Sequence, residues 1–586
     1  MADVSRKRLA ADMYLPDECW ESVFQFLNEN NYGGQSYLEH LSLVSKQFLS
    51  ITNRLRSSLT LRGLLFLDSF RLPFLARLLH RFPALTSLDL TQIHCDLNDL
   101  LSKISHFSLD LVSLNLSNGS SAIPDNGLQA LNGNMKKTLT SLKCFDMVPS
   151  RNKDLLLTLN CFPFLQEVDL SSPRGILQVE VRKFVSALPN LRKINLSGTF
   201  MSDTSLLYLC KNCKFLEEIV IIRCCVITVF GVASAIRERP GLRCLSVSML
   251  RSLKKFELQN PSALLSASLF SLKGLTYLDF SFSYTPDKLF FSLAEKGLPL
   301  RSLVLKDCFG YSYTGIFRLL SKCQLLQHLD LQLTEFLNDQ HVAKLSLLLG
   351  DLISINVSFC KQLTETTLFE LVKNCPLLAD INMEETSIGK TGWENPNSSM
   401  DLVVSPRVKS LRLKGNAWLR DKSIQMFADF FPNLELLDLS SCYCVFVGVG
   451  EVLRRSDKIR HLSLASSFGA KLLEMNLEVP KLEVLNLSRS ATDDEALYAI
   501  SKSCCGLLQL DLENCNDVTE KGVRQVVAKC TKLREINLRD CQNVAGNVVS
   551  EMVLSRPSLR KITIPPFYHP SDHERELFLH HGCLVF

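Results

Sequence analysis

Cysteine is the residue type in this sequence with the clearest capacity for chemistry. The chain holds 21 cysteines in 586 residues, and Cys210-x-x-Cys213 followed by Cys224-Cys225 places four thiols at a spacing that can bind zinc. The alternative is structural, because a thiol is also a small apolar side chain that suits a tight buried corner. The choice depends on whether these cysteines belong to a larger pattern.

Other reactive side chains form no recognisable catalytic set. The sequence has no glycine-rich phosphate loop, no nucleophile elbow, no His-Glu-x-x-His motif and no RING-like cysteine spacing. His569, His573, His580 and His581 lack a cysteine pair at ligand spacing, so we interpret them as solvated or structural. We therefore expect no catalysis and no cofactor, and no metal bound by these histidines.

The last four residues carry a second motif with two interpretations. Cys583-Leu-Val-Phe586 matches the C-a-a-X prenylation signal, and a prenylated Cys583 would attach to a membrane. However, Leu584-x-Phe586 follows Ile562-x-Ile564 by 22 residues, so it can also be a final strand. We favour the strand, because a buried thiol cannot reach a transferase and no polybasic second signal lies nearby.

Composition excludes several classes of protein. The net charge of +5 argues against a nucleic-acid binder, and 46% hydrophobic with 21% charged residues argues against disorder. No apolar run reaches about 18 residues, so we expect no membrane span. Residues 1–11 have no apolar segment of a secretory signal after their basic residues. These features predict reduced thiols and a location in the cytoplasm, the nucleus or both.

A repeat then sets the architecture. An apolar triple, spaced as in Leu434-x-x-Leu437-x-Leu439, recurs with a period that is mostly 25 or 26 residues. Its copies begin at residues 85, 111, 139, 165, 191, 216, 242, 275, 300, 326, 352, 378, 408, 434, 459, 482, 507, 533 and 559. One unit cannot bury its own apolar face, whereas stacked units share a continuous core. The period therefore predicts a solenoid.

Each unit reads as one strand followed by one helix. The alternating end of the triple is typical of a short strand. Thr492-Asp-Asp-Glu495 resembles a capping box before an apolar helix, and Thr519 is placed in the same way before Val523. The sequence thus predicts parallel strands alternating with helices.

The repeat also accounts for the cysteines. Positions are counted here as offsets from the first apolar residue of each copy. Six cysteines have offset 8 and five lie three residues before the next copy. They are Cys224, Cys308, Cys360, Cys442, Cys515 and Cys541, then Cys213, Cys323, Cys375, Cys504 and Cys530. This pattern resembles the cysteine-containing subclass of leucine-rich repeats. The resemblance implies an αβ horseshoe with parallel strands on its concave face, and it favours buried thiols over zinc.

Residues 13–57 do not follow the repeat. Leu15-Pro16-Asp17-Glu18 predicts a helix start. Trp20, Val23, Phe24 and Leu27 continue it, and after a glycine-containing break a second apolar helix carries Leu38, Leu41, Val44, Phe48 and Ile51. These two helices could form a module that binds another protein. Alternatively, they could form a helical cap that covers the first repeat.

The segment resembles an F-box, although its Asn28–Ser36 insertion is longer than usual. With the repeats, the chain is similar to plant-like F-box/leucine-rich-repeat proteins. That resemblance implies a substrate-recognition subunit of an SCF-type ubiquitin ligase, in which a Skp-family adaptor links the chain to cullin and RING proteins and the repeats bind a protein substrate. It implies adaptor contacts among Leu15, Pro16, Val23, Leu27, Leu43, Val44, Lys46 and Phe48. Some of these must instead face the segment's own core. The implied domains are a flexible tail (1–12), the F-box (13–57) and the repeats (58–586).

The exposed side of the strands is the expected binding surface. Offset 4 holds Asp or Asn in twelve copies: 89, 115, 169, 195, 279, 330, 356, 382, 438, 486, 511 and 537. This column is either a recognition stripe or a regular part of such repeats. Over offsets 2, 4 and 6 we count 12 acidic and seven basic residues, a mildly acidic face.

Four residues are candidate substrate contacts: Arg412 and Lys414, the one basic pair along a strand, with Asp438 and Trp393. Trp393 lies in a Gly- and Pro-containing insertion that is either a contact loop or neutral decoration. Two alternative functions remain open: a small-molecule receptor of the same architecture, which a basic cluster on the concave face or a ligand-sized pocket would favour, and a binding scaffold that acts without a ligase.

Overall fold

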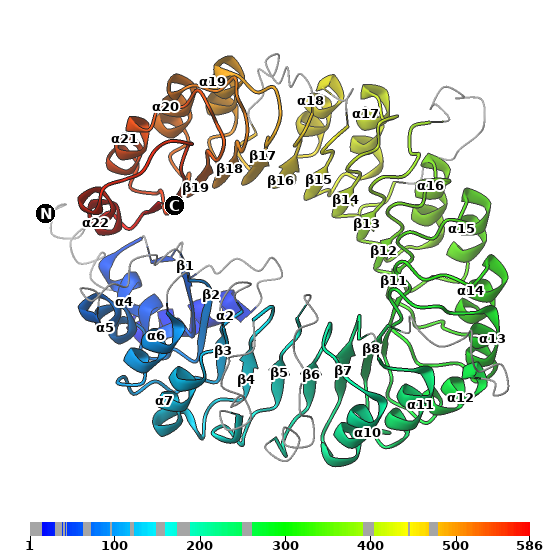
Figure 1. The fold of residues 1–586 in the computed structure, drawn as a ribbon. Helices are drawn as coiled ribbons and strands as arrows, with labels where there is room; N and C mark the ends of the chain where they lie inside the picture. The colour runs from blue at the N-terminus through cyan, green and yellow to red at the C-terminus, as the bar shows by residue number, and fades with distance from the viewer. Residues whose placement is uncertain are drawn as a thin grey trace, which may run out of the picture. The chain divides into compact units, whose positions relative to one another are not determined.

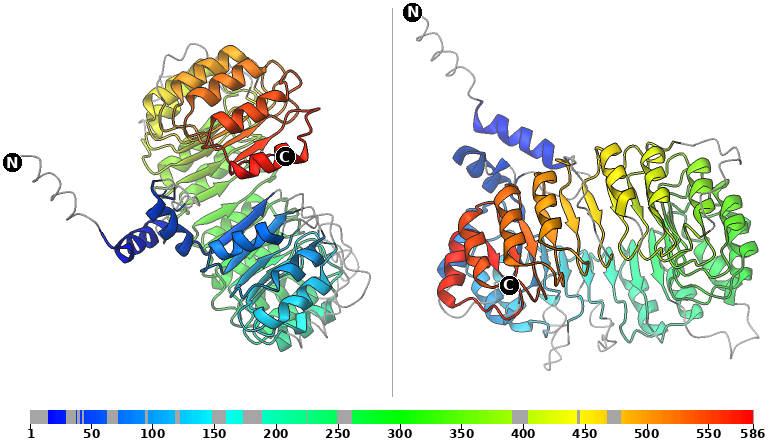
Figure 2. Two further views of the ribbon diagram at one scale, coloured as in Figure 1. Left: turned by 90° about the vertical axis from the view of Figure 1, so that its left-hand side faces the viewer. Right: turned by 90° about the horizontal axis from the view of Figure 1, so that it is seen from above.

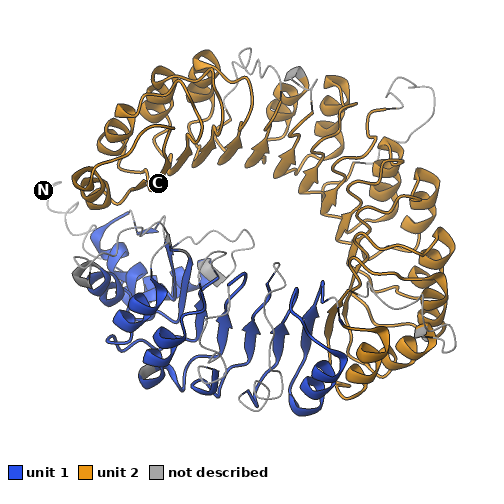
Figure 3. Ribbon diagram, viewed as in Figure 1, with its two compact units in different colours: residues 1–226 blue, residues 227–586 orange. Residues whose placement is uncertain are grey.

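The protein is described by a computed structural model covering residues 15–29, 38, 41–42, 44–62, 72–93, 96–117, 122–147, 159–172, 188–224, 226–248, 261–390, 404–442, 446–467 and 479–585. The chain divides into two compact units, Met1–Val226 and Ile227–Phe586 (Figure 3). Each unit is a row of parallel strands with helices along one side (Figures 1 and 2).

Unit 1 begins with two helices and continues with repeats. Its described elements are α2 (Asp17–Glu29), α4 (Lys46–Leu55), β1 (Ser58–Arg62), α5 (Leu72–Arg81), β2 (Ser87–Gln92), α6 (Leu97–Ile104), β3 (Ser113–Asn115), α7 (Asp125–Met135), β4 (Ser141–Lys143), β5 (Glu167–Asp169), β6 (Lys193–Asn195), α10 (Asp203–Asn212) and β7 (Glu218–Ile221). Each strand pairs in parallel with the next along the chain.

Unit 2 consists of repeats in the part that the structure describes. Its elements are α11 (Val229–Arg237), β8 (Cys244–Val247), α12 (Pro261–Leu269), β9 (Tyr277–Asp279), α13 (Asp287–Lys296), β10 (Ser302–Val304), α14 (Tyr313–Leu320), β11 (His328–Asp330), α15 (Asp339–Ser346), β12 (Ser354–Asn356), α16 (Glu365–Asn374), β13 (Asp380–Asn382), β14 (Ser410–Arg412), α17 (Asp421–Phe430), β15 (Leu436–Asp438), α18 (Phe446–Arg455), β16 (His461–Ser463), β17 (Val484–Asn486), α19 (Asp494–Ser503), β18 (Gln509–Asp511), α20 (Glu520–Lys529), β19 (Glu535–Asn537), α21 (Asn547–Ser555), β20 (Lys561–Thr563), α22 (Asp572–His580) and β21 (Leu584–Val585). The strands again pair in parallel in chain order.

The predicted leucine-rich-repeat solenoid is confirmed. Strands β2 to β20 begin two residues after the first apolar residue of each predicted copy. Leu303, Leu329 and Ile355 are in register on neighbouring strands and are buried. Because every copy points the same apolar positions inward, each unit has one continuous core.

Helix starts agree with the sequence in part. Thr519 is the N-cap of α20, and its side chain accepts a hydrogen bond from the Lys521 amide. The capping box predicted at Thr492 is wrong, because Asp493 is the N-cap of α19 and accepts from the Ala496 amide. A true capping box occurs at α22, between Ser571 and Glu574.

The offset-8 cysteines connect successive repeats. The Sγ of Cys360 donates to the carbonyl oxygen of Leu331 at 3.4 Å, and that of Cys541 donates to Leu512 at 3.0 Å. The other four, Cys224, Cys308, Cys442 and Cys515, contact the equivalent carbonyl of the preceding repeat. The thiol therefore fills a corner and gives the carbonyl a second donor, since the oxygen of Leu331 already accepts from the Thr334 amide and that of Leu512 from the Cys515 amide.

No helix among the described residues is both long and apolar enough to cross a membrane.

Candidate functional site

The two N-terminal helices pack around an aromatic cluster. The rings of Trp20 and Phe24 from α2 lie 4.8 and 4.9 Å from that of Phe48 in α4. Phe24 and Ile51 are buried at the centre, with Leu55 packed against them. Phe48 was predicted to contact the adaptor, but its side chain packs against this core.

Polar contacts fix the angle between these helices. Arg54 of α4 forms ion pairs with Asp17 at 2.8 Å and Glu21 at 2.6 Å, both on α2. Gln47 Nε2 donates to Asp17 Oδ1 at 2.8 Å, and with Arg54 this bond holds the pKa of Asp17 below its ordinary value. Ser45 caps α4 by accepting from the Phe48 amide at 3.1 Å.

Apolar side chains are exposed on the outside of this pair. Leu15, Val23, Leu27 and Val44 are 46%, 43%, 37% and 65% exposed, and Phe26 is 64% exposed. We call these five residues the N-terminal apolar strip. The sequence predicted one helix carrying Leu38 to Ile51, which is wrong at Val44, because this residue lies in a turn before α4.

The other predicted adaptor residues are also accounted for. Pro16 and Lys46 are exposed, and Leu43 lies outside the described residues. Phe26 was missed by the sequence argument, although it lies three residues after Val23 and so shares its helix face. Exposed apolar area of this kind is typical of a protein-binding surface.

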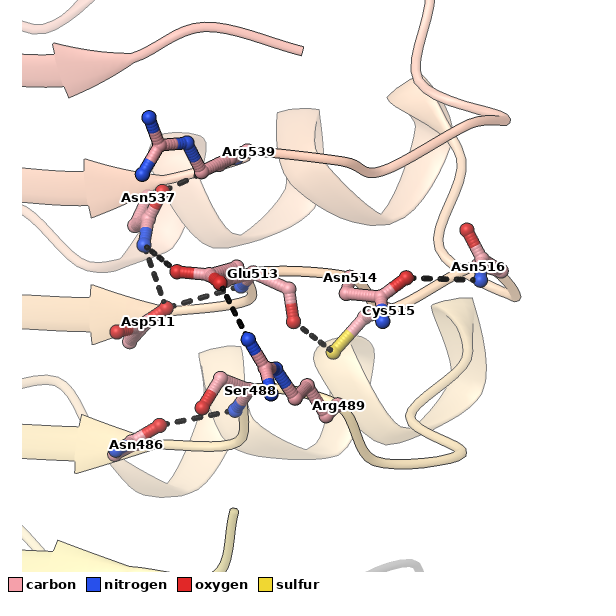
Figure 4. Close-up of polar contacts among 10 residues, drawn as sticks. All are labelled: Asn486, Ser488, Arg489, Asp511, Glu513, Asn514, Cys515, Asn516, Asn537 and Arg539. Atoms are coloured by element: carbon pink, nitrogen blue, oxygen red, sulfur yellow. Dashed lines mark hydrogen bonds and ion pairs between the residues drawn. The ribbon is translucent and has the colours of Figure 1, made fainter. Parts of the chain in front are cut away.

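The Asp and Asn column at offset 4 forms a ladder along the strand face. Asp511 Oδ1 accepts from the Glu513 amide at 3.0 Å, and Asn537 Oδ1 accepts from the Arg539 amide at 3.1 Å (Figure 4). Asn537 Nδ2 also donates to Asp511 Oδ1 at 2.9 Å, which joins the two repeats.

All twelve members of the column make the same contact. Each accepts from the main-chain N–H two residues further on. Side chains so engaged hold the turn that ends each strand. Of the two interpretations left open by the sequence, the structural one is therefore favoured. Asp438, a predicted substrate contact, accepts from both the amide and the hydroxyl of Ser440.

Acidic groups surround the predicted basic pair. The Arg412 guanidinium lies 2.6 Å from Asp380 Oδ1 on the neighbouring strand. Burial raises the pKa of Glu384, as does the nearby Asp438 carboxylate, while Lys414 and Arg412 oppose the rise. Two cations among three carboxylates do not make a polyanion site. Trp393 lies outside the described residues.

The cysteines of the zinc motif have structural positions. Cys224 Sγ donates to the Leu196 carbonyl at 3.2 Å, and Cys213 is the C-cap of α10. Cys225 lies outside the described residues. In the described ranges, no three His, Cys, Asp or Glu side chains are grouped to hold a metal ion.

Cys583 precedes the final strand predicted from the sequence. Leu584 and Val585 of β21 pair in parallel with Lys561 and Ile562 of β20. Cys583 is 1% exposed, and burial raises the pKa of its thiol to about 12. Phe586 is outside the described residues.

No family model matches the chain. It is 25% identical over 175 residues to the putative F-box/LRR-repeat protein 23 of Arabidopsis thaliana; this match spans 29% of this chain and only 32% of that protein. Among solved structures, it resembles Rad7 in the yeast Rad7–Elc1 complex (TM-score 0.38, 16% identity, 89% of this chain and 92% of that chain). It also resembles a chain of the TLR13–ssRNA13 complex (TM-score 0.40, 14% identity, 87% and 74%). Both TM-scores are too low to relate these proteins in function.

Proposed function

We propose that this chain is the substrate-recognition subunit of an SCF-type ubiquitin ligase. Its N-terminal helices bind a Skp-family adaptor, which connects it to cullin and RING proteins, and its repeats bind the protein to be ubiquitinated. The chain performs no chemistry itself and acts by holding the target near the ubiquitin-charged enzyme. It would do so in the cytoplasm or nucleus.

The N-terminal apolar strip is the observation that carries this proposal. Val23, Phe26 and Leu27 follow one another at the spacing of one helix face, and all three are exposed. A helix face of this type fits an apolar groove on a partner. Further support comes from the order of the elements, a helical pair followed by leucine-rich repeats, and from the name of the curated Arabidopsis relative.

The proposal is tested by binding of the full chain to a purified Skp-family adaptor. A Leu15→Ala/Val23→Ala/Leu27→Ala variant removes three exposed side chains. We expect adaptor affinity to fall at least about tenfold, because one well-buried apolar anchor commonly contributes 1 kcal/mol or more. The unfolding midpoint should not change, since none of the three is part of the core.

The matched control is Phe200→Ala, which removes a side chain that is 55% exposed on a repeat of the same unit. It should bind adaptor like the unchanged chain. Equal affinity of the triple variant and the control overturns the proposal. If the unchanged chain does not bind adaptor at all, the scaffold alternative replaces it.

A further inference from the structure

One backbone position in the repeat is left-handed in most of the described copies. The residue at offset 7 has a positive φ in all of the described copies that follow: Asp146, Gly198, Arg223, Phe282, Asp307, Leu333, Phe359, Glu385, Gly415, Ser441, Ser466, Arg489, Asn514 and Asp540. This conformation suits Gly and, less well, Asn or Asp, and costs other residues on the order of 1 kcal/mol. The turn requires the conformation, whereas the type of side chain differs from copy to copy.

Three of these residues are apolar, and they lie in four consecutive repeats. Phe282, Leu333 and Phe359 have φ of 61°, 64° and 63°. Leu333 is 38% and Phe359 is 36% exposed. The backbone conformation disfavours bulky apolar side chains here. The two aromatic rings also lie near lysines of the chain itself, with Lys306 Nζ 5.9 Å from the Phe282 ring centroid and Lys361 Nζ 5.6 Å from that of Phe359.

Hydrogen bonds to the next repeat fix the main chain at these positions. The amide of Phe282 donates to the Lys306 carbonyl at 2.9 Å, and the amide of Leu333 donates to Ser358 at 3.0 Å. Two more aromatic residues extend the row, since the Tyr284 ring lies 5.6 Å from that of Phe309, which is 52% exposed. We define the apolar rim as Phe282, Tyr284, Phe309, Leu333 and Phe359.

The surface beside the apolar rim is acidic. Asp307 and Glu335 are exposed in the turns after strands β10 and β11. Neither forms an ion pair within the part of the chain that the structure describes. Asp279 and Asp330 belong to the ladder instead, since their carboxylates accept hydrogen bonds within the chain. A cationic group from outside would find uncompensated carboxylates here.

We propose that the apolar rim and the carboxylates beside it bind a protein segment in which apolar or aromatic side chains alternate with Lys or Arg. The negative charge disfavours nucleic acid and anionic lipid, and the apolar row disfavours a purely basic ligand. Residues whose main chain is already fixed lose little backbone freedom on binding, which suits them as anchors. This inference deepens the proposed function, because the segment would be the recognised part of the substrate.

The test uses the full chain and an array of synthetic peptides in which Leu, Phe or Trp alternates with Lys or Arg. A matched array carries Glu in place of Lys and Arg. We expect binding to the basic peptides, weakened by salt, and none to the acidic set. Equal binding to both arrays, or to neither, overturns the proposal.

A variant makes the test specific. Phe282→Asn/Leu333→Asn/Phe359→Asn places at all three positions a residue that tolerates the left-handed conformation. Affinity for the best basic peptide should fall about 100-fold, as expected for loss of several anchors. The unfolding midpoint should stay the same or rise, which separates loss of contact from loss of fold.

The matched control is Phe567→Asn, at a left-handed residue with φ of 65° that is 87% exposed and lies after β20. It should bind the peptide like the unchanged chain. Unchanged binding by the triple variant, or equal losses in the variant and the control, overturns the proposal. Since no adaptor is present, failure here is distinct from failure of the adaptor experiment.

Discussion

Two stretches of the strand face in unit 2 share one backbone but differ in side chains. Around β9–β12, the left-handed positions include Phe282 and Phe359. Around β17–β19 they are all polar, and Arg489 lies 3.3 Å from Glu513, which also accepts from Asn537 (Figure 4). In the second stretch these charges pair with each other, whereas in the first stretch apolar groups are exposed and Asp307 and Glu335 form no ion pair with any residue that the structure describes.

The features common to both stretches are those that build the solenoid. Both have buried strand centres, the Asp–Asn ladder and thiols that donate to the preceding repeat. The difference indicates that the side chains at the left-handed offset-7 positions, and the charged residues beside them, can vary without loss of the fold. These residues are therefore available to bind a partner. Four predictions test this division.

The largest effect is expected in the shared core. Leu303→Ala and Leu510→Ala each remove a fully buried strand centre, which should lower the free energy of unfolding by about 2–5 kcal/mol. The losses should be similar, since the two sites are equivalent. Urea unfolding followed by circular dichroism measures these losses. A loss in only one of the two variants would show that the two sites do not contribute equally to stability.

The ladder should show a smaller effect of the same kind. Asp330→Ala and Asp511→Ala leave a main-chain N–H and an Asn amide without their acceptor, at about 1–3 kcal/mol each. Asp→Asn at the same sites retains a main-chain acceptor and should recover most of the loss. If alanine costs nothing in urea unfolding, the ladder is not structural.

Buried thiols should make stability depend on alkaline pH in both stretches. Burial raises the pKa of Cys360 and Cys541 from 9.0 to about 12. Their contribution is complete below pH 9 and is lost as pH rises through 12, because the unfolded thiol ionises first. The slope is at most about 1.4 kcal/mol per pH unit and thiol.

Urea unfolding at pH 8 and pH 10 measures this slope. Cys360→Ala and Cys541→Ala should each flatten it by a comparable amount. Cys505→Ala is the control, since Cys505 is exposed. A slope that is the same in all three variants would contradict the burial argument.

The smallest effect distinguishes the stretches. Phe359→Asn should raise the free energy of unfolding by up to about 1 kcal/mol, because Asn tolerates a positive φ better. Asn514→Phe should lower it by a similar amount. If Phe359→Asn is instead destabilising, the aromatic side chain has a structural role and the apolar rim is part of the fold.

Much of the fold could be predicted because it depends on periodic burial. The apolar triple located β2 to β20 and the final strand, since each copy is stable only with its apolar side chains inside. The offsets of Cys360 and Cys541 likewise predicted burial. Less could be predicted of the N-terminal helices, where periodicity placed Val44 in a helix and did not separate Phe48 from the exposed residues.

The sequence by itself determined the repeat, the strand positions and the apolar character of each core. Only the tertiary structure decided what the polar residues do. From the sequence, Asp438 and Asp511 could each serve in recognition or in a turn. The structure shows that each accepts a hydrogen bond from the main-chain amide two residues further on, which identifies them as turn residues. Phe282 and Phe359 look like ordinary apolar residues until the backbone places them at a positive φ and toward solvent. The reason is physical: burial follows from composition and period, whereas hydrogen-bond partners and backbone conformation depend on the neighbouring repeat.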